Sequence, residues 1–419
     1  MPALRDYLLR SSQEILDALS TATEPSASQI SVKSELRSLL IIQDEKSDDD
    51  ATINFVLACA LLSSSQSSTN PLLSWIPSAL AHSASMSFGE LSTKICCSRD
   101  VNGEDIVPNE CNVVVQLMPR MLHILKDRIK ESSIDKSKDG DAAAAASART
   151  PVGFAILAAH QFRWLVTQVD RESLKNMCTL VIPCGLTALD HWSPQVQMEG
   201  MISFVYMTKN VNAGDLTVYE DPLLDACCQS LVCADEIWPN AVEMSVFVVS
   251  LVQHSNPRSS WYEKMFNEML NHLERHPRNK AHRISWLKFV DPLLHSLGLL
   301  LLAHFRRLFP LLFLWMHADD DETVLLVLQR TTTVIKLTWI RNTAYIERLV
   351  DELALLYKET ALRIAREDIR KEISALMLLL KQGKFLHFER AWPKHADDSN
   401  LTPLRLTLSK DDVTSAHLE

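Results

Sequence analysis

The sequence has little glycine, few aromatic residues and no long uncharged apolar run. Its 419 residues include 9 Gly, 17 Pro, 6 Tyr and 13 Phe. Strand-rich folds need many glycine-bearing turns, whereas this chain is rich in Leu, Ala and Ser, a composition that favours helices. We therefore expect an all-α protein.

Short motifs that mark common catalytic sites are also missing. The sequence contains no G-x-x-x-x-G-K-[ST] phosphate loop, no G-x-G-x-x-G, no H-E-x-x-H and no G-x-S-x-G elbow. We expect a protein that is not an enzyme, with no catalytic residue, cofactor or bound metal. The nine cysteines never occur as C-x-x-C, the spacing of zinc ribbons and thioredoxin-like sites. They are predicted to be reduced, buried thiols of an intracellular protein.

The charge balance and the apolar runs limit the surfaces that the chain can bind. With 42 basic and 52 acidic residues the net charge is −10, which argues against direct nucleic-acid binding and against adsorption to anionic membranes. The most apolar run, 292–305, ends at Arg306 and Arg307, and the next, 308–318, contains Pro310. A spanning helix needs about 20 apolar residues. We expect two short buried helices and no membrane span.

The N-terminal stretch MPALRDYLLRSSQEILDAL carries charges in its first turns and lacks the apolar core of a secretory signal. It is interpreted as an amphipathic helix. We expect a cytoplasmic protein, with the nucleus as a second location.

Four polar stretches interrupt the helical pattern, and they set the expected domains. They are QDEKSDDDA (43–51), SSSQSSTN (63–70), SRDVNGEDIVPNE (98–110) and ESSIDKSKDGDAAAAASA (131–148). Such stretches bury too little apolar surface to offset the entropy lost on ordering, so they are predicted to be loops. The predicted organisation is an N-terminal helical region with Ser/Asp-rich loops (1–130), a low-complexity linker (131–150), HEAT-like helical repeats (151–390) and a C-terminal tail (391–419).

Two long segments share one pattern. In TLVIPCGLTALDHWSPQVQMEGMISFVYMTKNV (179–211) and in HFRRLFPLLFLWMHADDDETVLLVLQRTTTVI (304–335), an apolar helix containing a proline ends at a polar turn and a second apolar helix follows. Pro183 and Pro310 are 127 positions apart, about three periods of the 40–47 residues typical of paired-helix repeats. The pattern predicts a HEAT/armadillo-like α-solenoid of stacked antiparallel helix pairs.

Helix breaks are predicted at several places after Thr150. They are at Pro183, 191–194, 210–215, Pro239, 254–260, 276–280 and 317–322. In the last of these, Asp319, Asp320 and Asp321 are interpreted as caps of the following helix, because Asp accepts bonds from its first free amides and complements its dipole. A calcium loop would need spaced oxygens and a glycine turn, which this segment lacks.

A basic segment, RHPRNKAHR (275–283), is interpreted as a solvated helix end and loop, with binding of phosphate or of an acidic partner as the alternative. His272 and His276 have the i, i+4 spacing of a metal-binding pair but lack the general-base Glu of the zinc-protease motif. They are interpreted as part of the same helix end.

Aromatic residues near predicted turns are the candidates for contacting a partner, since Trp is enriched at binding hot spots. The candidates are Trp192, Trp238, Trp261, Phe388 and Trp392. The alternative for each is packing at a helix end. For the C-terminal tail, folding back onto the last repeat and docking on a partner both remain open.

The segment IPCGLTALDHWSPQVQMEGMISFVYMTKNVNAGDL (182–216) resembles the characteristic stretch of the Tti-two family, the second Tel-interacting subunit of the Triple T complex. LDHWSP matches its acidic-aromatic turn with proline, Gly200 its helix glycine, and Asn210 and Val211 the residues before its loop. DPLLDACCQSLVCADEIWPNAVEMSV (221–246) resembles the next helix pair. The long Ser-rich insertions of the N-terminal third depart from the family pattern.

The resemblance implies a non-enzymatic adaptor that works with the ninety-kilodalton heat-shock chaperone to mature and stabilise phosphatidylinositol-3-kinase-like kinases. Its implied partners are other helical-repeat subunits of the Triple T complex, and indirectly the chaperone machinery and kinase clients. The alternative is an adaptor of a transport or import type that captures basic linear peptides in an acidic groove, motivated by the net charge of −10 and the Trp residues.

Overall fold

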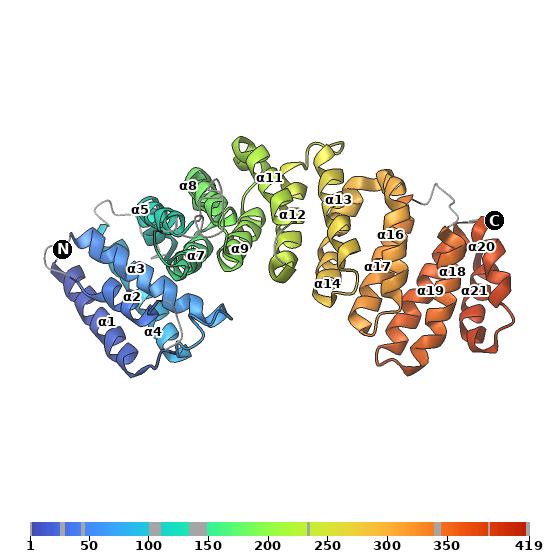
Figure 1. Cartoon of the computed structure of the whole chain (residues 1–419), viewed down its shortest axis with the longest axis horizontal. Coiled ribbons are helices and arrows are strands. Elements are labelled where there is room, and N and C mark those ends of the chain that lie inside the picture. The colour runs from blue at the N-terminus through green and yellow to red at the C-terminus, as the bar shows by residue number, and fades with distance from the viewer. Residues whose placement is uncertain are drawn as a thin grey trace. The chain divides into compact units, whose positions relative to one another are not determined.

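The computed structural model describes residues 2–25, 30–42, 47–99, 110–133, 149–232, 235–338, 345–383 and 386–415. Over these ranges the chain forms helices and no strand, as predicted (Figure 1). Internal packing divides it into two units. Unit 1 comprises Met1–Ala226 and Cys233–Met244, and unit 2 comprises Cys227–Val232 and Ser245–Glu419.

This division does not follow the predicted domains. It falls inside the predicted repeat region 151–390, and most of the predicted linker, 134–148, lies outside the described residues. The N-terminal region and the first repeats form one packed unit, because α7 (Val152–Thr167) packs against both α3 (Asp48–Ser64) and α5 (Glu110–Glu131). Buried apolar faces therefore join the two sides of the predicted linker.

Unit 1 is built from helices in two layers. One layer contains α5 and α8, which lie side by side (Figure 1). The other layer contains α3, α7 and α9, each packed on the next. The pair α8–α9 is the helix pair predicted from residues 179–211. The elements are α1 (Pro2–Thr21), α2 (Val32–Leu40), α3, η1 (Ser65–Ser67), α4 (Ser78–Arg99), α5, α7, α8 (Arg171–Leu189), α9 (Pro194–Asn210), α10 (Ala213–Leu216), η2 (Thr217–Tyr219), α11 (Glu220–Ser230), η3 (Asp235–Ile237) and α12 (Trp238–Val252). Residues of α11 and of α12 belong to both units.

Unit 2 repeats the two-layer plan. The first layer is α13, α16, α18 and α20, and the second is α14, α17, α19 and α21, so each helix packs on the equivalent helix of the next pair (Figure 1). This is the arrangement of a HEAT/armadillo-like α-solenoid. The elements are α13 (Ser260–Arg275), α14 (Lys280–Phe289), α15 (Asp291–Leu297), η4 (Gly298–Leu300), α16 (Leu301–Met316), α17 (Asp321–Thr338), α18 (Tyr345–Glu359), η5 (Thr360–Leu362), α19 (Arg366–Gln382), α20 (Leu386–Ala391), η6 (Trp392–His395), η7 (Ser399–Leu401) and α21 (Thr402–Ser415).

Polar links between neighbouring helix pairs recur at the repeat period. Arg283 binds Asp320 at 2.6 Å, Arg363 binds Asp321 at 3.0 Å and Lys358 binds Asp398 at 3.2 Å. Their sequence separations are 37, 42 and 40 residues. This spacing is close to the period of paired-helix repeats.

Of the three aspartates predicted to cap α17, Asp320 has that role. The amide of Thr323 donates to Asp320 Oδ1 at 2.9 Å. Asp321 accepts from the amide of Ala365 at 2.9 Å as well as from Arg363, and Asp319 is exposed. The turn thus caps its own helix and also fastens the helix pairs on either side.

Most predicted breaks coincide with helix ends, but two proline assignments are wrong. Pro183 lies inside α8, as the paired-helix pattern has it, and its neighbours Val181, Ile182 and Cys184 are buried. Pro239 lies in the first turn of α12, where helix amides have no intrahelical partner and proline loses nothing. The break precedes it.

The polar stretches predicted as loops are partly helical. Ser47 caps α3 by accepting from the amide of Asp50, so Asp48 to Asp50 form the first turn of that helix. Ser63 and Ser64 end the same helix, and η1 follows. Residues 43–46 and 100–109 lie outside the described residues.

Asp291–Met316 is the one stretch of the described residues long and apolar enough to cross a membrane, and half of its most apolar window is buried. The predicted division at Arg306 and Arg307 is wrong, because α16 runs through both. The break lies at Gly298, whose φ of +50° separates α15 from α16. The guanidinium of Arg307 lies over α13, where it donates to Asn267, Asn271 and Glu274, so the charges occupy the polar face of a packed helix.

The C-terminal segment folds back onto the last repeat. Leu401, Leu404 and Leu408 are buried, α21 packs on α19, and Lys381 Nζ donates to the carbonyl of Leu408 at 2.8 Å. Of the two alternatives for the tail, the structure shows the capping one.

We predict that Asp321→Asn reduces the loss of folding stability that occurs as the pH is lowered. The bonds from Ala365 and Arg363 hold the pKa of the Asp321 carboxyl below its ordinary value. A lowered folded-state pKa contributes stability that is present above the unfolded value of about 3.9 and is lost as pH falls through the folded value. Urea midpoints measured from about pH 5 to pH 3 should therefore fall less in the variant than in the wild type. Asp319→Asn is the control and should follow the wild type; equal slopes for Asp321→Asn and wild type would contradict the assignment.

Candidate functional site: exposed aromatics and a buried charge cluster

The five aromatic residues predicted to contact a partner differ in exposure. Trp238 is fully buried and Phe388 is 2% exposed, so the prediction is wrong for these two. Trp261 and Trp392 are half-buried: Lys264 lies 4.0 Å from the ring centroid of Trp261, and Trp392 stacks on Phe388.

Trp192 keeps the most accessible ring of the set, 42% exposed, in the turn between α8 and α9. Its Nε1 donates to the carbonyl of Ser132 at 2.9 Å, and its ring stacks on His191. His191 is itself buried and lies 3.1 Å from Ser132 Oγ. The ring of Trp192 is therefore held in one orientation against the end of α5 while part of its surface stays open.

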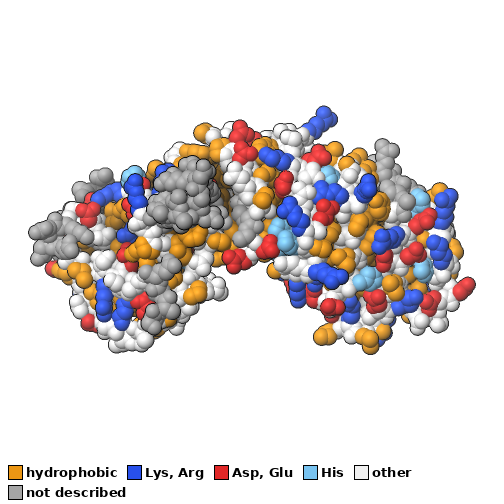
Figure 2. All heavy atoms as spheres, viewed as in Figure 1, with side chains coloured by type: hydrophobic (Ala, Val, Ile, Leu, Met, Phe, Trp, Pro, Cys, Tyr) orange, Lys and Arg blue, Asp and Glu red, His pale blue; other side chains and the backbone are white. Residues whose placement is uncertain are grey.

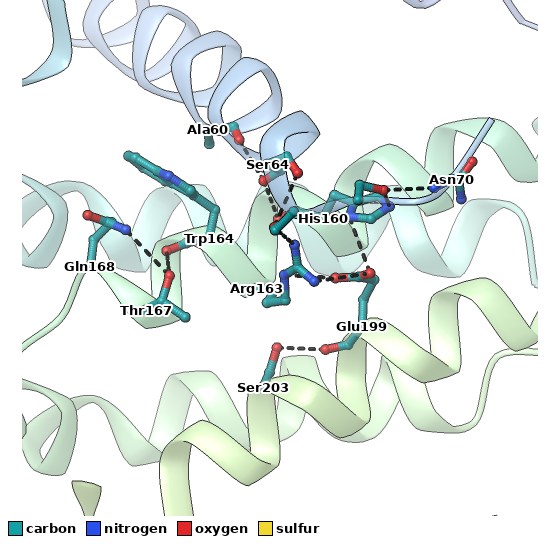
Figure 3. Close-up of polar contacts among 12 residues, drawn as sticks. Ala60, Ser64, Asn70, His160, Arg163, Trp164, Thr167, Gln168, Glu199 and Ser203 are labelled. Atoms are coloured by element: carbon teal, nitrogen blue, oxygen red, sulfur yellow. Dashed lines mark hydrogen bonds and ion pairs between the residues drawn. The ribbon is translucent and has the colours of Figure 1, made fainter. Parts of the chain in front are cut away.

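A buried charge cluster lies where α7 meets α9 (Figure 3). Arg163 Nε contacts Glu199 Oε2 at 3.0 Å, and His160 Nδ1 lies 3.3 Å from Glu199 Oε1. The side chains of His160 and Glu199 are each 1% exposed. Arg163 also donates to Ser67 Oγ at 2.8 Å, so the cluster joins α7, α9 and η1.

Close approach of α8 and α9 brings Glu199 to this position. A Cβ at Gly185 would lie 2.8 Å from the ring of Phe204, and one at Gly200 would lie 3.1 Å from the Cβ of Ala188. Both helices need glycine at these points to pack this closely. Gly200, one of the residues that carry the Tti-two resemblance, therefore has a packing role.

Ser68, His160 and Glu199 contact one another in the order serine, histidine, carboxylate, as in the catalytic triad of a hydrolase. Ser68 Oγ lies 3.5 Å from His160 Nε2, and His160 contacts Glu199. Ser68 Oγ, however, accepts from the amide of Asn70 at 3.1 Å, and the guanidinium of Arg163 neutralises Glu199. With His160 almost wholly buried, the arrangement can hold helices together but offers a substrate no approach to the imidazole.

Sequence reasoning missed Glu199, although a signal was present. In QMEGM the glutamate occurs within an apolar helix that has a glycine as its next residue. A buried carboxylate needs a cation, and Arg163 is 36 residues away in sequence, so only the packed structure identifies the pair.

The basic segment 275–283 is partly neutralised by its neighbours. Arg283 and Lys280 both contact Asp320, at 2.6 and 3.7 Å, while Arg275 and Arg278 are exposed. His272 Nε2 lies 3.1 Å from His282 Nδ1. His276 ends α13 as its C-cap, which agrees with the helix-end interpretation, but His272 is buried at 6% exposed, so the solvated helix end does not include it.

The cysteines whose side chains the structure describes are buried free thiols, as predicted: Cys59, Cys178, Cys184, Cys227 and Cys228. Burial raises the pKa of the Cys184 thiol to about 12. A thiol this difficult to ionise is a poor nucleophile at neutral pH.

No protein-family model matches the chain. It is 51% identical over 406 residues to an Arabidopsis thaliana protein designated "Uncharacterized protein At2g39910", and this similarity covers 95% of the chain and 93% of the relative. The chain belongs to the family of this Arabidopsis protein. The relative does not confirm the Tti-two resemblance.

Among solved structures, the chain is similar to one in a complex of Kap95p with RanGDP, with a TM-score of 0.47 and 11% identity over 87% of this chain. A second match, in a Kap95–Nup1 complex, has a TM-score of 0.42 and 12% identity over 96% of this chain. The chain spans 50% and 56% of the length of these two proteins.

We predict that Glu199→Ala lowers the free energy of unfolding by about 3 kcal/mol, because it leaves the guanidinium of Arg163, whose side chain is only 14% exposed, without its carboxylate partner. Urea denaturation measures the loss. Glu243→Ala is the control: its carboxylate forms a more exposed pair with Lys209 at 3.7 Å, and its removal should cost less than about 1 kcal/mol. Similar losses in the two variants would show that the cluster does not stabilise the junction of α7 and α9.

Proposed function

We propose that this protein is a non-enzymatic scaffold subunit of the Triple T kind, which binds other helical-repeat proteins. The observation that carries the proposal is the turn LDHWSP. This turn bears the family resemblance and presents Trp192 as an exposed aromatic ring fixed by Ser132 and His191. A rigid Trp loses little conformational entropy when it is buried by a partner, which is the property of a binding hot spot.

The repeat architecture supports the same proposal. In each unit, successive helix pairs cover one another and leave extended outer surfaces made of helix faces and turns. Proteins of this architecture use such surfaces for shape-matched contacts with partners. In our proposal the partners are the other Triple T subunits, and the chaperone machinery and phosphatidylinositol-3-kinase-like kinase clients are reached through them.

The proposed role needs no cofactor, metal or catalytic residue. It places the protein in the cytoplasm, with the nucleus as a second location, where such kinases signal. These features are part of the proposal and are tested with it.

The import-type alternative gains no support from the acidic face of α18. Glu347, Asp351 and Glu352 would be natural contacts for a basic peptide. Each is instead paired with a histidine: Glu347 with His387 at 2.9 Å, Asp351 with His395 at 2.7 Å, and Glu352 with His317 at 3.0 Å. A peptide would have to displace these internal partners.

The test is affinity purification of the tagged full chain from its own cells, followed by mass spectrometry. We expect stoichiometric recovery of two larger helical-repeat subunits, with kinase and chaperone components. Trp192→Ala should reduce recovery by roughly tenfold or more, since a central aromatic anchor is lost.

Leu314→Ala is the control, because it truncates an apolar side chain of similar exposure, 46%, outside the candidate set, and it should retain the partners. Both variants should keep the circular dichroism of the wild type, and recovery is measured well below the melting temperature of each. Recovery of transport cargo, or of nothing stoichiometric, would contradict the proposed function. Full recovery with Trp192→Ala would remove Trp192 from the interface.

A further inference from the structure

Two apolar side chains between α18 and α19 stand out by their exposure. Leu362 is 97% exposed and Ile364 102%, more than any other large apolar side chain that the structure describes. Leu362 is the last residue of η5, and Ile364 lies in the short connection that follows, with Arg363 between them. We name Leu362 and Ile364 the apolar hook.

Arg363, the residue between Leu362 and Ile364, fixes the backbone of the hook. Arg363 is extended, with φ −92° and ψ 150°, so its neighbours at i−1 and i+1 project to the opposite side from its own side chain. Its guanidinium binds Asp321 Oδ1 at 3.0 Å and the carbonyl of Ala318 at 2.7 Å. The amide of Ala365 donates to Asp321 Oδ2 at 2.9 Å.

The residues before the hook are fixed as well. Thr360 is fully buried, and its hydroxyl accepts from Arg370 Nε at 2.9 Å. The guanidinium of Arg370 lies 4.5 Å from the ring centroid of Tyr357. The connection is therefore ordered on both sides, and a partner that buries the hook does not have to order it.

Folding gives no reason for apolar residues at these two positions. Both side chains are as exposed as in an unfolded chain, so their burial contributes nothing to the core. Polar residues at positions 362 and 364 could adopt the same backbone conformation. Two large aliphatic groups held out rigidly suit a protein pocket that removes them from water.

The charges around the hook indicate which pocket fits. Between residues 358 and 368 the exposed charged residues are Glu359, Arg366, Glu367 and Asp368, and the neighbouring turn adds Asp319. Acidic groups thus outnumber basic ones. This charge disfavours an anionic membrane surface and favours a pocket whose rim carries Lys or Arg.

We propose that the apolar hook docks into an apolar pocket with a basic rim on a protein partner of this scaffold. The α18–α19 connection that carries it lies at the lower end of unit 2 in Figure 1, beside the α16–α17 turn, and orange side chains project along that edge in Figure 2. The proposal rests on the scaffold function and names the surface that serves it.

The experiment compares three tagged full-length chains: wild type, Leu362→Ser/Ile364→Ser, and the control Leu299→Ser/Leu300→Ser. The control removes two adjacent leucines that are 48% and 52% exposed elsewhere in unit 2. The stoichiometric partner recovered with the wild type is purified and titrated against each chain. The hook variant should keep the wild-type melting temperature, because the hook makes no core contact, and all three chains are titrated well below the lowest melting temperature among them.

We expect the hook variant to lose at least roughly tenfold in affinity and the control to stay within about twofold. The wild-type affinity should fall as salt is raised from low to high concentration. Photocrosslinking from benzoylphenylalanine at position 364 should attach to a partner peptide with apolar residues flanked by Lys or Arg.

Equal affinity of the hook variant and the wild type would overturn the hook while leaving the scaffold function intact. Failure of the wild type to recover a stoichiometric partner would overturn both. Hook-dependent sedimentation with vesicles of phosphatidylcholine and phosphatidylserine would assign the hook to a membrane and overturn the protein pocket.

Discussion

The structure depends on a constraint common to every helix pair in it: one pair cannot cover its own apolar faces. In unit 2, Trp286 of α14 and Trp315 of α16 lie edge to face with ring centroids 5.8 Å apart, and both are almost completely buried. Phe309 of α16 stacks on Tyr345 of α18 in the next pair. Because each pair is buried by its neighbours, stability grows with the stack and outer faces remain available for partners.

Polar contacts add direction to this apolar stacking. A carboxylate at an intra-pair turn serves its own helix as a cap and its neighbour as an ion-pair partner, as Asp320 does for α17 and Arg283. The buried cluster at Glu199 works differently, since it links α7 to α9 through charges removed from water. Such a pair contributes little net energy compared with apolar packing, but breaking it is costly, so it restricts how these helices can be aligned.

Local rules predicted the features that depend on short stretches of sequence. The helix pairs at 179–211 and 304–335 and the capping role of the acidic turn follow from apolar periodicity and from the preference of Asp for helix starts. Features that depend on distant residues were not predictable in this way. Trp238 and Trp192 both occur near turns, and only tertiary packing distinguishes them. Trp238 is buried, whereas Trp192 is held at the surface by a hydrogen bond to Ser132, 60 residues away. The packing of residues before 131 with those after 150 likewise depends on tertiary contacts.

In the proposed function, this solenoid works by holding rigid turns against a protein partner. Hydrogen exchange measured by mass spectrometry on the full chain, free and bound to its recovered partner, tests it most directly. On binding, we expect slower exchange in peptides covering Trp192 and the connection at 360–366, with helices α7 and α17 unchanged. Slowing confined to other surfaces, or no change in either turn, would contradict it.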